Sequence, residues 1–223
     1  MLNENQYDYL CIQSAKKIIK QDTCVLFDVG TNIGNYISLF KENFNNIKVY
    51  GFEPNPDIFY IAKQKFENDP NVEINNFGLN DEDCEATLHF PENLTVLASM
   101  FQRKHFSNFT NIKKISAKFT TLDNFCLKNN VDRIDYLKVD TEGNELSVLN
   151  GAKEYFKNKK VICGQIEYGG TYPDANISIK DIIRFFNKYD YELYDVETNT
   201  CLTELHFSSE DFQLRNYFFK IKQ

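Results

Sequence analysis

The sequence lacks the features that mark secreted, membrane-spanning and disulfide-bonded proteins. It contains no apolar run of the roughly eighteen residues that a membrane-spanning helix needs. Its first ten residues have neither a basic segment nor an apolar one, so they do not resemble a secretory signal. The six cysteines form no C-x-x-C pair and stand singly, at Cys11, Cys24, Cys84, Cys126, Cys163 and Cys201. These absences predict a cytoplasmic protein with reduced thiols and no zinc knuckle.

Positive charge is also scarce. The chain has 25 lysines and arginines against 32 aspartates and glutamates, a net charge of −7. Proteins that bind nucleic acids normally present a basic face, so this balance argues against a nucleic-acid partner. No linker, internal repeat or low-complexity segment divides the 223 residues, which are therefore expected to form a single domain over residues 1–223. The sequence does not indicate an oligomeric state.

Two common nucleotide-binding motifs are missing from the stretch where they would be expected. Residues 24–40, CVLFDVGTNIGNYISLF, begin with an apolar run typical of a buried strand. Gly30 and Gly34 then bracket a tight turn, and a helical pattern starts at about Asn32. The glycines have the spacing G-x-x-x-G, which is neither the dinucleotide fingerprint G-x-G-x-x-G nor the phosphate loop G-x-x-x-x-G-K-[ST]. The stretch predicts a nucleoside-sized pocket without a phosphate-binding loop.

Acidic residues end the first two predicted strands. Asp28 follows the first apolar run, at the carboxyl end of the strand, where ligands bind in open α/β sheets. The second predicted strand, residues 47–52, ends at Glu53 and is followed by Pro54 and Pro56. A carboxylate at this position can accept hydrogen bonds from ribose hydroxyls and would repel a 2′-phosphate. These residues predict a site for an unphosphorylated ribose.

Three motifs, in order along the chain, resemble those of the FkbM family of class I S-adenosylmethionine-dependent methyltransferases. They are DVGTNIG at 28–34, GFEPNPDIF at 51–59 and YLKVDTEGNELSVLNGA at 136–152, and a TLD element at 121–123 precedes the last of them. The resemblance covers residues 24–167. It implies S-adenosylmethionine as the cofactor and an α/β fold, a Rossmann-like doubly wound sheet of seven strands whose last strand runs antiparallel.

The rest of the chain alternates between strand and helix patterns, as a doubly wound sheet requires. Further strands are predicted at 71–77, 134–139, 161–166, 191–196 and 214–221, and helices at 5–20, 57–66, 122–129, 144–156 and 177–186. Residues 84–119 depart from this alternation, because strand patterns at 86–90 and 113–119 flank a polar and aromatic loop. We predict an inserted antiparallel hairpin there, with a lid over the site. The N-terminal helix, within residues 1–22, is expected to pack on the sheet.

The motifs and the resemblance together indicate which residues contact the cofactor. In the methyltransferase fold the loop after the third strand faces the adenine, which implicates Asp81, although a solvated turn is the alternative. Ser99 resembles the serine element of the family. The predicted cofactor-binding residues are Asp28, Gly30, Thr31, Asn32, Gly34, Glu53, Pro54, Asn55, Gly78, Leu79, Asp81, Ser99 and Asp140.

Catalytic candidates are the carboxylates that follow the fourth and fifth strands. Asp140, with Glu142 and Glu167, could hold a divalent metal through oxygen ligands, or one of them could act as the general base for a hydroxyl. His105, in the predicted lid, is a further candidate base or hydrogen-bond donor. The alternatives are that residues 140–143 only order the next helix start and that His105 is an exposed loop residue. No histidine lies near the carboxylates in sequence, so a histidine-containing metal site is not predicted.

The best interpretation is S-adenosylmethionine-dependent O-methylation of a sugar or another small-molecule hydroxyl, so that the partner is a small-molecule or glycan acceptor. One alternative is an NAD-dependent nucleotide-sugar oxidoreductase or epimerase, which the missing G-x-G-x-x-G and Y-x-x-x-K motifs disfavour. Another is a non-catalytic module that binds S-adenosylmethionine. Net charge and the lack of a DPPY-like tetrad disfavour a nucleic-acid methyltransferase. Nothing in the sequence names the acceptor.

Overall fold

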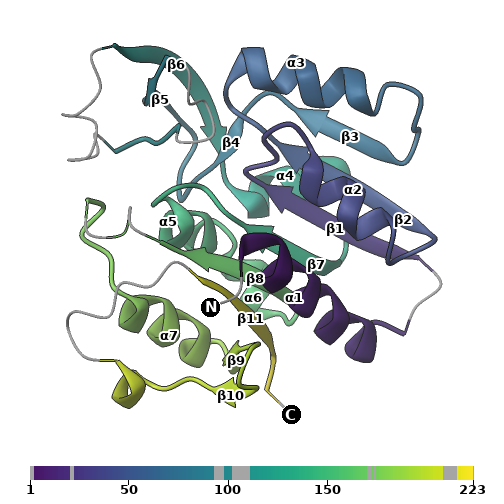
Figure 1. Ribbon diagram of the computed structural model, residues 1–223, viewed down its shortest axis with the longest axis vertical. Helices are drawn as coiled ribbons and strands as arrows, with labels where there is room; N and C mark the ends of the chain where they lie inside the picture. The colour runs from purple at the N-terminus through teal and green to yellow at the C-terminus, as the bar shows by residue number, and fades with distance from the viewer. Residues whose placement is uncertain are drawn as a thin grey trace.

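The computed structural model describes residues 3–20, 23–92, 98–101, 111–169, 172, 174–207 and 215–222. An eight-stranded sheet lies at the centre with helices on both faces, and a separate three-stranded sheet lies at one end of it (Figure 1). Among the described residues, no helix combines the length and the apolar character needed to cross a bilayer.

The central sheet has the strand order β10-β9-β11-β8-β7-β1-β2-β3. Its strands are β1 (Cys24–Val29), β2 (Ile47–Phe52), β3 (Val72–Asn75), β7 (Ile134–Val139), β8 (Val161–Tyr168), β9 (Tyr191–Asp195), β10 (Thr200–Cys201) and β11 (Arg215–Ile221). The pairs β1–β2, β2–β3, β1–β7 and β7–β8 are parallel, whereas β11 is antiparallel to both β8 and β9. The predicted doubly wound sheet with an antiparallel last strand is confirmed. The predicted count of seven strands is wrong, because the two residues of β10 pair with β9 and extend the edge.

Helices cover the two faces of the sheet in separate groups. They are α1 (Glu4–Ile18), α2 (Asn35–Lys41), α3 (Pro56–Lys65), α4 (Leu122–Asn129), α5 (Glu145–Asn150), α6 (Lys153–Lys157) and α7 (Ile179–Lys188). Strand side chains alternate between faces. Leu26 of β1 packs in one apolar cluster with α1 and α2, and Phe27 packs in the other with α4, α6 and α7. Both faces are therefore buried, as the continuous apolar strand runs predict.

Capping residues set the starts of three helices. The Asn3 side chain accepts the N–H of Gln6, whose side chain accepts the N–H of Asn3 in return, so that α1 begins with a capping box. Ser178 does the same at α7. Asn55 caps α3, and Pro56 occupies its first turn, where no N–H is needed. The hydrogen-bonding needs of the first turns are met locally, which explains why the predicted starts agree with these to within a few residues.

Two helix boundaries differ from the prediction because of backbone geometry. The helix after the glycine turn begins at Asn35 and not at Asn32, since Asn32 and Gly34 have positive φ angles of 49° and 76° that an α-helix cannot contain. Residues 144–156 form two helices, α5 and α6, that break at Gly151. A Cβ on Gly151 would lie 2.0 Å from the Asn80 carbonyl oxygen, so the backbone of the preceding loop packs directly against this break.

The predicted hairpin is present. Strands β5 (Cys84–Pro91) and β6 (Ile112–Thr120) are antiparallel, and β4 (Gly78–Leu79) pairs with β6 to complete the second sheet. Gly78, one of the predicted cofactor-binding residues, lies in β4 against the Phe119 ring. Most of the predicted lid, which spans residues 91–112, lies outside the described residues, namely 93–97 and 102–110 with His105.

Candidate functional site

Polar side chains gather at the carboxyl ends of β1, β7 and β8, on the face that α1 covers. Asp28, Lys138 and Gln165 are register partners across these three strands, so their side chains lie on the same face of the sheet. Asp140 and Glu167 come two residues later on β7 and β8 and fall on that face again. A face that is apolar along most of its length thus becomes polar where ligands bind in sheets of this kind.

The turn after β1 is clamped to both neighbouring strands. The N–H groups of Gly30 and Thr31 donate to the Phe52 carbonyl oxygen at 3.1 Å. The Thr31 hydroxyl donates to the Asp28 carbonyl oxygen and accepts the Phe52 N–H, both at 2.8 Å. Gly30 has a φ of 84°, and a Cβ there would lie 1.8 Å from the Asp140 carbonyl oxygen. Only glycine fits this position without moving the backbone.

The Glu53 carboxylate holds two backbone segments together and still has acceptor capacity. Its two oxygens accept the N–H groups of Asn32 and Asn55, each at 2.9 Å. Burial raises the pKa of Glu53 to about 7. Each carboxylate oxygen keeps a second lone pair for a hydroxyl donor.

Next to the Glu53 carboxylate, the side-chain amide nitrogen of Asn55 is buried. No group in the described part of the chain accepts its hydrogens. The Asn55 side-chain oxygen is already used, because it accepts the Asp57 N–H at 3.1 Å. Buried donors without a partner are rare in folded proteins and call for an explanation. The free acceptors of Glu53 and the unpaired donor of Asn55 fit the ribose hydroxyls of S-adenosylmethionine.

Asp28 lies beneath the turn instead of facing a ligand. Its side chain is fully buried, and the Asp28 Oδ1 lies 3.6 Å from the Lys138 ammonium nitrogen. Burial raises the pKa of Asp28 to about 6. The predicted role of Asp28 in cofactor binding stays a prediction.

Three further predicted cofactor residues, Leu79, Asp81 and Ser99, lie in or beside the second sheet. Leu79 is buried in β4, and its carbonyl oxygen accepts the Asn144 side-chain amide at 3.1 Å. Asp81 is exposed in the bend after β4. The buried Ser99 hydroxyl donates to the Glu142 carbonyl oxygen at 2.7 Å and accepts the Phe101 N–H at 3.1 Å. Ser99 therefore ties the second sheet to the loop that follows β7.

That loop is ordered by a carboxylate that the sequence interpretation missed. The fully buried Glu145 accepts the Thr141 N–H at 2.7 Å and the Gly143 N–H at 3.0 Å. Glu142 and Gly143 have positive φ angles of 57° and 107°. The helix-ordering role considered for residues 140–143 is thus carried out by Glu145, at the first position of α5, where a carboxylate is favourable. The sequence feature that could have identified Glu145 was its position at a predicted helix start.

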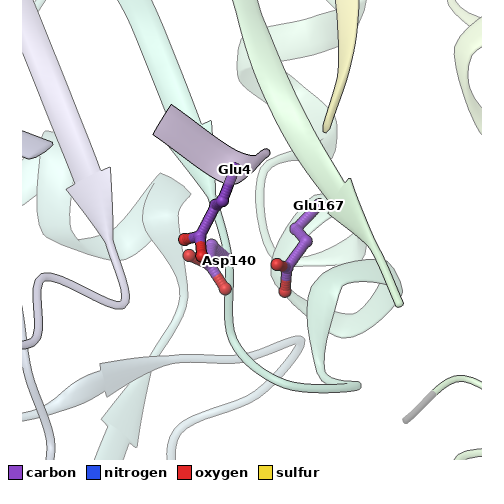
Figure 2. Close-up of side chains that lie close together, drawn as sticks. All are labelled: Glu4, Asp140 and Glu167. Atoms are coloured by element: carbon purple, nitrogen blue, oxygen red, sulfur yellow. The ribbon is translucent and has the colours of Figure 1, made fainter. Parts of the chain in front are cut away.

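Three carboxylates from different elements meet at the carboxyl end of β7. Glu4 from the first turn of α1, Asp140 after β7 and Glu167 in β8 each offer an oxygen, and these oxygens lie within 4.8 Å of one another (Figure 2). We call these residues the carboxylate cluster. The predicted proximity of Asp140 and Glu167 agrees with this geometry. Glu4 was not among the predicted residues, and the role of Glu142, which has a left-handed backbone with a φ of 57°, stays a prediction.

The environment of the carboxylate cluster raises the pKa values of two of its members. Burial, the negative charges of Asp140 and Glu142 and a hydrogen bond with Asp140 hold the pKa of Glu167 well above its usual range. Partial burial and the same Asp140 charge also raise the pKa of Glu4. Two carboxylates in contact cannot both ionise without a large cost, which is the physical reason why the pKa of Glu167 is raised.

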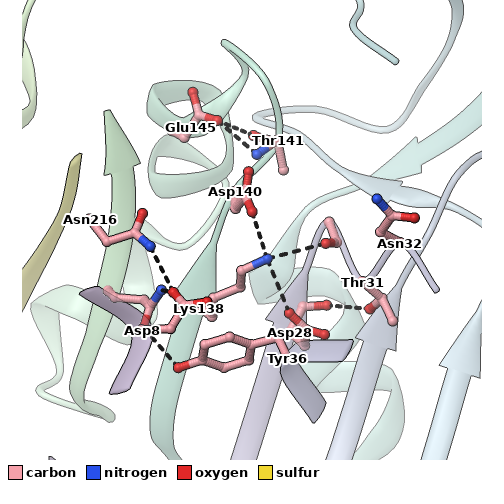
Figure 3. A network of polar contacts seen from close by, with 12 residues as sticks. Asp8, Asp28, Thr31, Asn32, Tyr36, Lys138, Asp140, Thr141, Glu145 and Asn216 are labelled. Carbon is pink, nitrogen blue, oxygen red and sulfur yellow. Dashed lines mark hydrogen bonds and ion pairs between the residues drawn. The ribbon is translucent and has the colours of Figure 1, made fainter. Parts of the chain in front are cut away.

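A buried lysine balances part of this negative charge. The Lys138 ammonium nitrogen lies 2.8 Å from an Asp140 carboxylate oxygen, and it donates to the Gly30 carbonyl oxygen at 3.3 Å (Figure 3). The charges of Asp140 and Asp28 outweigh its burial and raise the pKa of Lys138. The sequence interpretation also missed this residue. The sequence feature that could have identified Lys138 was a lysine between apolar neighbours in a predicted buried strand.

Helix α1 is fixed to the sheet by buried polar contacts. The Asp8 carboxylate accepts the side-chain amides of Gln165 and Asn216, both at 2.7 Å. The Tyr7 hydroxyl donates to Glu197 at 2.9 Å. Burial raises the pKa of Asp8 to about 6. These contacts hold α1 on the sheet, and with it Glu4 beside Asp140 and Glu167 (Figure 2).

Comparison with known proteins places the chain among methyltransferases. The model of the FkbM methyltransferase domain matches residues 28–193. The hexuronic acid methyltransferase AglP of Haloferax volcanii is 26% identical over 189 residues, which are 84% of this chain and 68% of AglP. Methyltransferase 1 of Beauveria bassiana is 30% identical over 153 residues, 58% of this chain. The matched region spans 59% of that second relative.

Solved structures show the same fold at low sequence identity. A Streptococcus mutans protein in complex with SAH (S-adenosylhomocysteine) has a TM-score of 0.52 and 11% identity, with 99% of both chains covered. An rRNA methylase from Streptococcus thermophilus has a TM-score of 0.51 and 11% identity, covering 100% of this chain and 99% of its own. Because RNA-modifying enzymes share the fold, the charge argument does not by itself exclude a nucleic-acid acceptor.

The family match spans both the glycine turn and the segment that carries Lys138 and Asp140. The chain belongs to the FkbM family of S-adenosylmethionine-dependent methyltransferases.

Proposed function

We propose that this protein transfers a methyl group from S-adenosylmethionine to a hydroxyl of a sugar. The observation that carries the proposal is the carboxylate cluster, which lies beside the turn clamped by Phe52 and contains the ionisable groups that a hydroxyl acceptor needs. The similarity to AglP, a hexuronic acid methyltransferase, supports a sugar as the acceptor. The family match favours this function over the NAD-dependent alternative.

On the cofactor side, Glu53 and Asn55 bind the ribose, and the backbone of residues 30–34 lies against the rest of the nucleoside. The bound cofactor supplies a methyl group on a positively charged sulfur, so no covalent enzyme intermediate is needed. The protein aligns the acceptor hydroxyl with that methyl group and takes up the hydroxyl proton.

On the acceptor side, carboxylates suit a polyhydroxylated ligand. Sugar hydroxyls donate hydrogen bonds to the oxygens of Glu4, Asp140 and Glu167. Asp140 lies against the glycine turn, since its N–H donates to the Val29 carbonyl oxygen at 3.0 Å, and its side chain is partly exposed, so we assign it the role of the general base. A negatively charged acceptor group would be repelled by this cluster, which favours an uncharged hydroxyl over a carboxylate as the methylated group.

An acceptor panel with labelled S-adenosylmethionine tests this assignment. Label should enter uncharged hexoses or their nucleotide conjugates as a methyl ether that survives mild alkali. Hexuronic acids and an RNA oligonucleotide serve as the competing classes. Label in RNA alone would overturn the sugar assignment, and an alkali-labile methyl ester would show a carboxylate acceptor. Cofactor binding without transfer to any acceptor would support the non-catalytic alternative.

We expect methyl transfer to be independent of a divalent metal. Oxygen ligands in the carboxylate cluster suit Mg²⁺ or Mn²⁺ in kind. However, the Lys138 ammonium nitrogen already lies 2.8 Å from an Asp140 carboxylate oxygen, so a cation of the protein itself balances the charge at which a metal would bind. Turnover should survive treatment with a chelator. Activity that is lost to the chelator and restored by added Mg²⁺ or Mn²⁺ would show that the cluster is a metal site.

Cofactor affinity should rise with pH because of Glu53. Its pKa in the free protein is raised to about 7, so the carboxyl is protonated below that pH and ionised above it. Ribose hydroxyls donate to the ionised form, so affinity for S-adenosylhomocysteine should increase up to about pH 7 and then level off. Glu53→Gln should remove this dependence and weaken binding by about 1.5–3 kcal/mol.

Titration calorimetry between about pH 5.5 and pH 8.5 measures this effect. Glu73→Gln is the matched control, because Glu73 is an exposed residue of β3 and faces no candidate ligand group of the turn. A pH dependence that persists in Glu53→Gln would assign the effect to another group.

A further inference from the structure

The Lys138 ammonium group joins the two halves of the site. Lys138 is 5% exposed, and its ammonium group contacts four residues. They are Asp28 Oδ1 at 3.6 Å, the Gly30 carbonyl oxygen at 3.3 Å, Asp140 Oδ2 at 2.8 Å and the Tyr36 ring at 5.4 Å from its centroid. One cation therefore contacts the turn on the cofactor side and the proposed base on the acceptor side (Figure 3).

We propose that Lys138 is a positioning residue that couples the cofactor turn to the acceptor carboxylates. This inference rests on the proposed function and deepens it. The charged hydrogen bond from Lys138 to Gly30 fixes the carbonyl group of the turn. The ion pair between Lys138 and Asp140 fixes the direction of the Asp140 carboxylate. Alignment of the methyl group with the acceptor hydroxyl then depends on one side chain in the sheet.

The alternative is that Lys138 only neutralises Asp28. Asp28 is fully buried, and in the described part of the chain its carboxylate oxygens have no hydrogen-bond partner, so it needs a counter-ion. The distances favour a further role, because the ammonium nitrogen lies closer to Asp140 than to Asp28. Asp140 is partly exposed, and water could solvate it without a buried cation. Because Asp140 does not need Lys138 as a substitute for water, we attribute their contact to orientation of the Asp140 carboxylate.

A charge-matched comparison separates the two roles. Asp28→Asn serves as the reference, because it removes the buried charge that would be left unpaired without the lysine. The test variant is Asp28→Asn with Lys138→Met, in which the side chain keeps its length and loses its charge. The control is Asp28→Asn with Lys157→Met, since Lys157 is an exposed lysine of α6 whose ion pair with Glu154 is 3.7 Å long.

Three quantities are measured on each variant: the melting temperature, the affinity for S-adenosylhomocysteine, and kcat with KM for the sugar acceptor. Relative to Asp28→Asn, the test variant should bind S-adenosylhomocysteine at least about tenfold more weakly, as loss of one charge-assisted hydrogen bond predicts. Its kcat at saturating substrates should fall by at least about tenfold, with KM for the acceptor changed by less than about threefold. The Lys157 control should match the reference.

Equal affinity and equal kcat in the test variant and the reference would leave Lys138 as a counter-ion and overturn the proposal. Weaker binding with unchanged kcat would also overturn the coupling. If the test variant melts early, Lys138→Gln in the same background keeps a neutral donor for the Gly30 carbonyl and reports the same quantities. Calorimetry needs no acceptor, so failure to methylate any sugar would count against the proposed function and not against the Lys138 contact with the turn.

Discussion

Replacing Asp140 with asparagine should lower kcat by about 10²–10⁴ while the protein still folds and binds S-adenosylmethionine nearly normally. The variant keeps the size of the side chain and an oxygen that can accept from Lys138, which lies 2.8 Å away in the parent protein. It removes the group that takes up the hydroxyl proton. Single-turnover transfer to the acceptor from the panel, with a melting curve and a cofactor titration, separates chemistry from folding and binding.

Asp135→Asn is the matched control for this change. Asp135 lies in the same strand, is buried, and forms an ion pair with Arg133 at 2.7 Å, at the end of β7 remote from the carboxylate cluster. Its loss should lower stability and leave kcat of the folded protein unchanged. Near-normal turnover in Asp140→Asn, or a drop in melting temperature that accounts for the whole loss, would contradict the assignment. The base would then be sought at Glu167, at Glu142, or at His105, which lies outside the described residues.

Gly30→Val should abolish detectable cofactor binding and destabilise the fold by about 2–5 kcal/mol. Gly30 has a φ of 84°, a conformation that a β-branched residue rarely adopts. Its Cβ would lie 1.8 Å from the Asp140 carbonyl oxygen, which is backbone and cannot rotate away. The chain would have to separate the turn from β7, and both halves of the site would move.

Gly34→Val gives the graded comparison for this prediction. Gly34 also has a positive φ, of 76°, but its Cβ would meet the ring of Phe66, a side chain that can shift. We expect a smaller loss of stability there. Urea unfolding and titration with S-adenosylhomocysteine measure both variants. Comparable stability of Gly30→Val and the parent protein would show that the turn does not pack against β7 as described.

Local sequence determined most of the fold and the cofactor half of the site. The apolar run at 25–27, the glycine spacing and the strand-end Glu53 act over a few residues each, so their pattern can be read directly. The same holds for capping residues such as Asn55, which satisfies backbone groups two residues away. Because the carboxyl ends of parallel strands meet at one edge, the approach of Asp140 to Glu167 could also be predicted.

Tertiary structure alone decided which other groups join Asp140 and Glu167 in the site. Glu4 reaches the carboxylate cluster because Asp8, one helical turn later, is held by Gln165 and Asn216 from β8 and β11. Lys138 lies opposite Asp28 because of the register between β7 and β1, which the pattern of a single strand does not contain. Contacts of this kind depend on how distant elements pack. Burial then sets the proton affinity of Glu167, a property that its position in the sequence could not show.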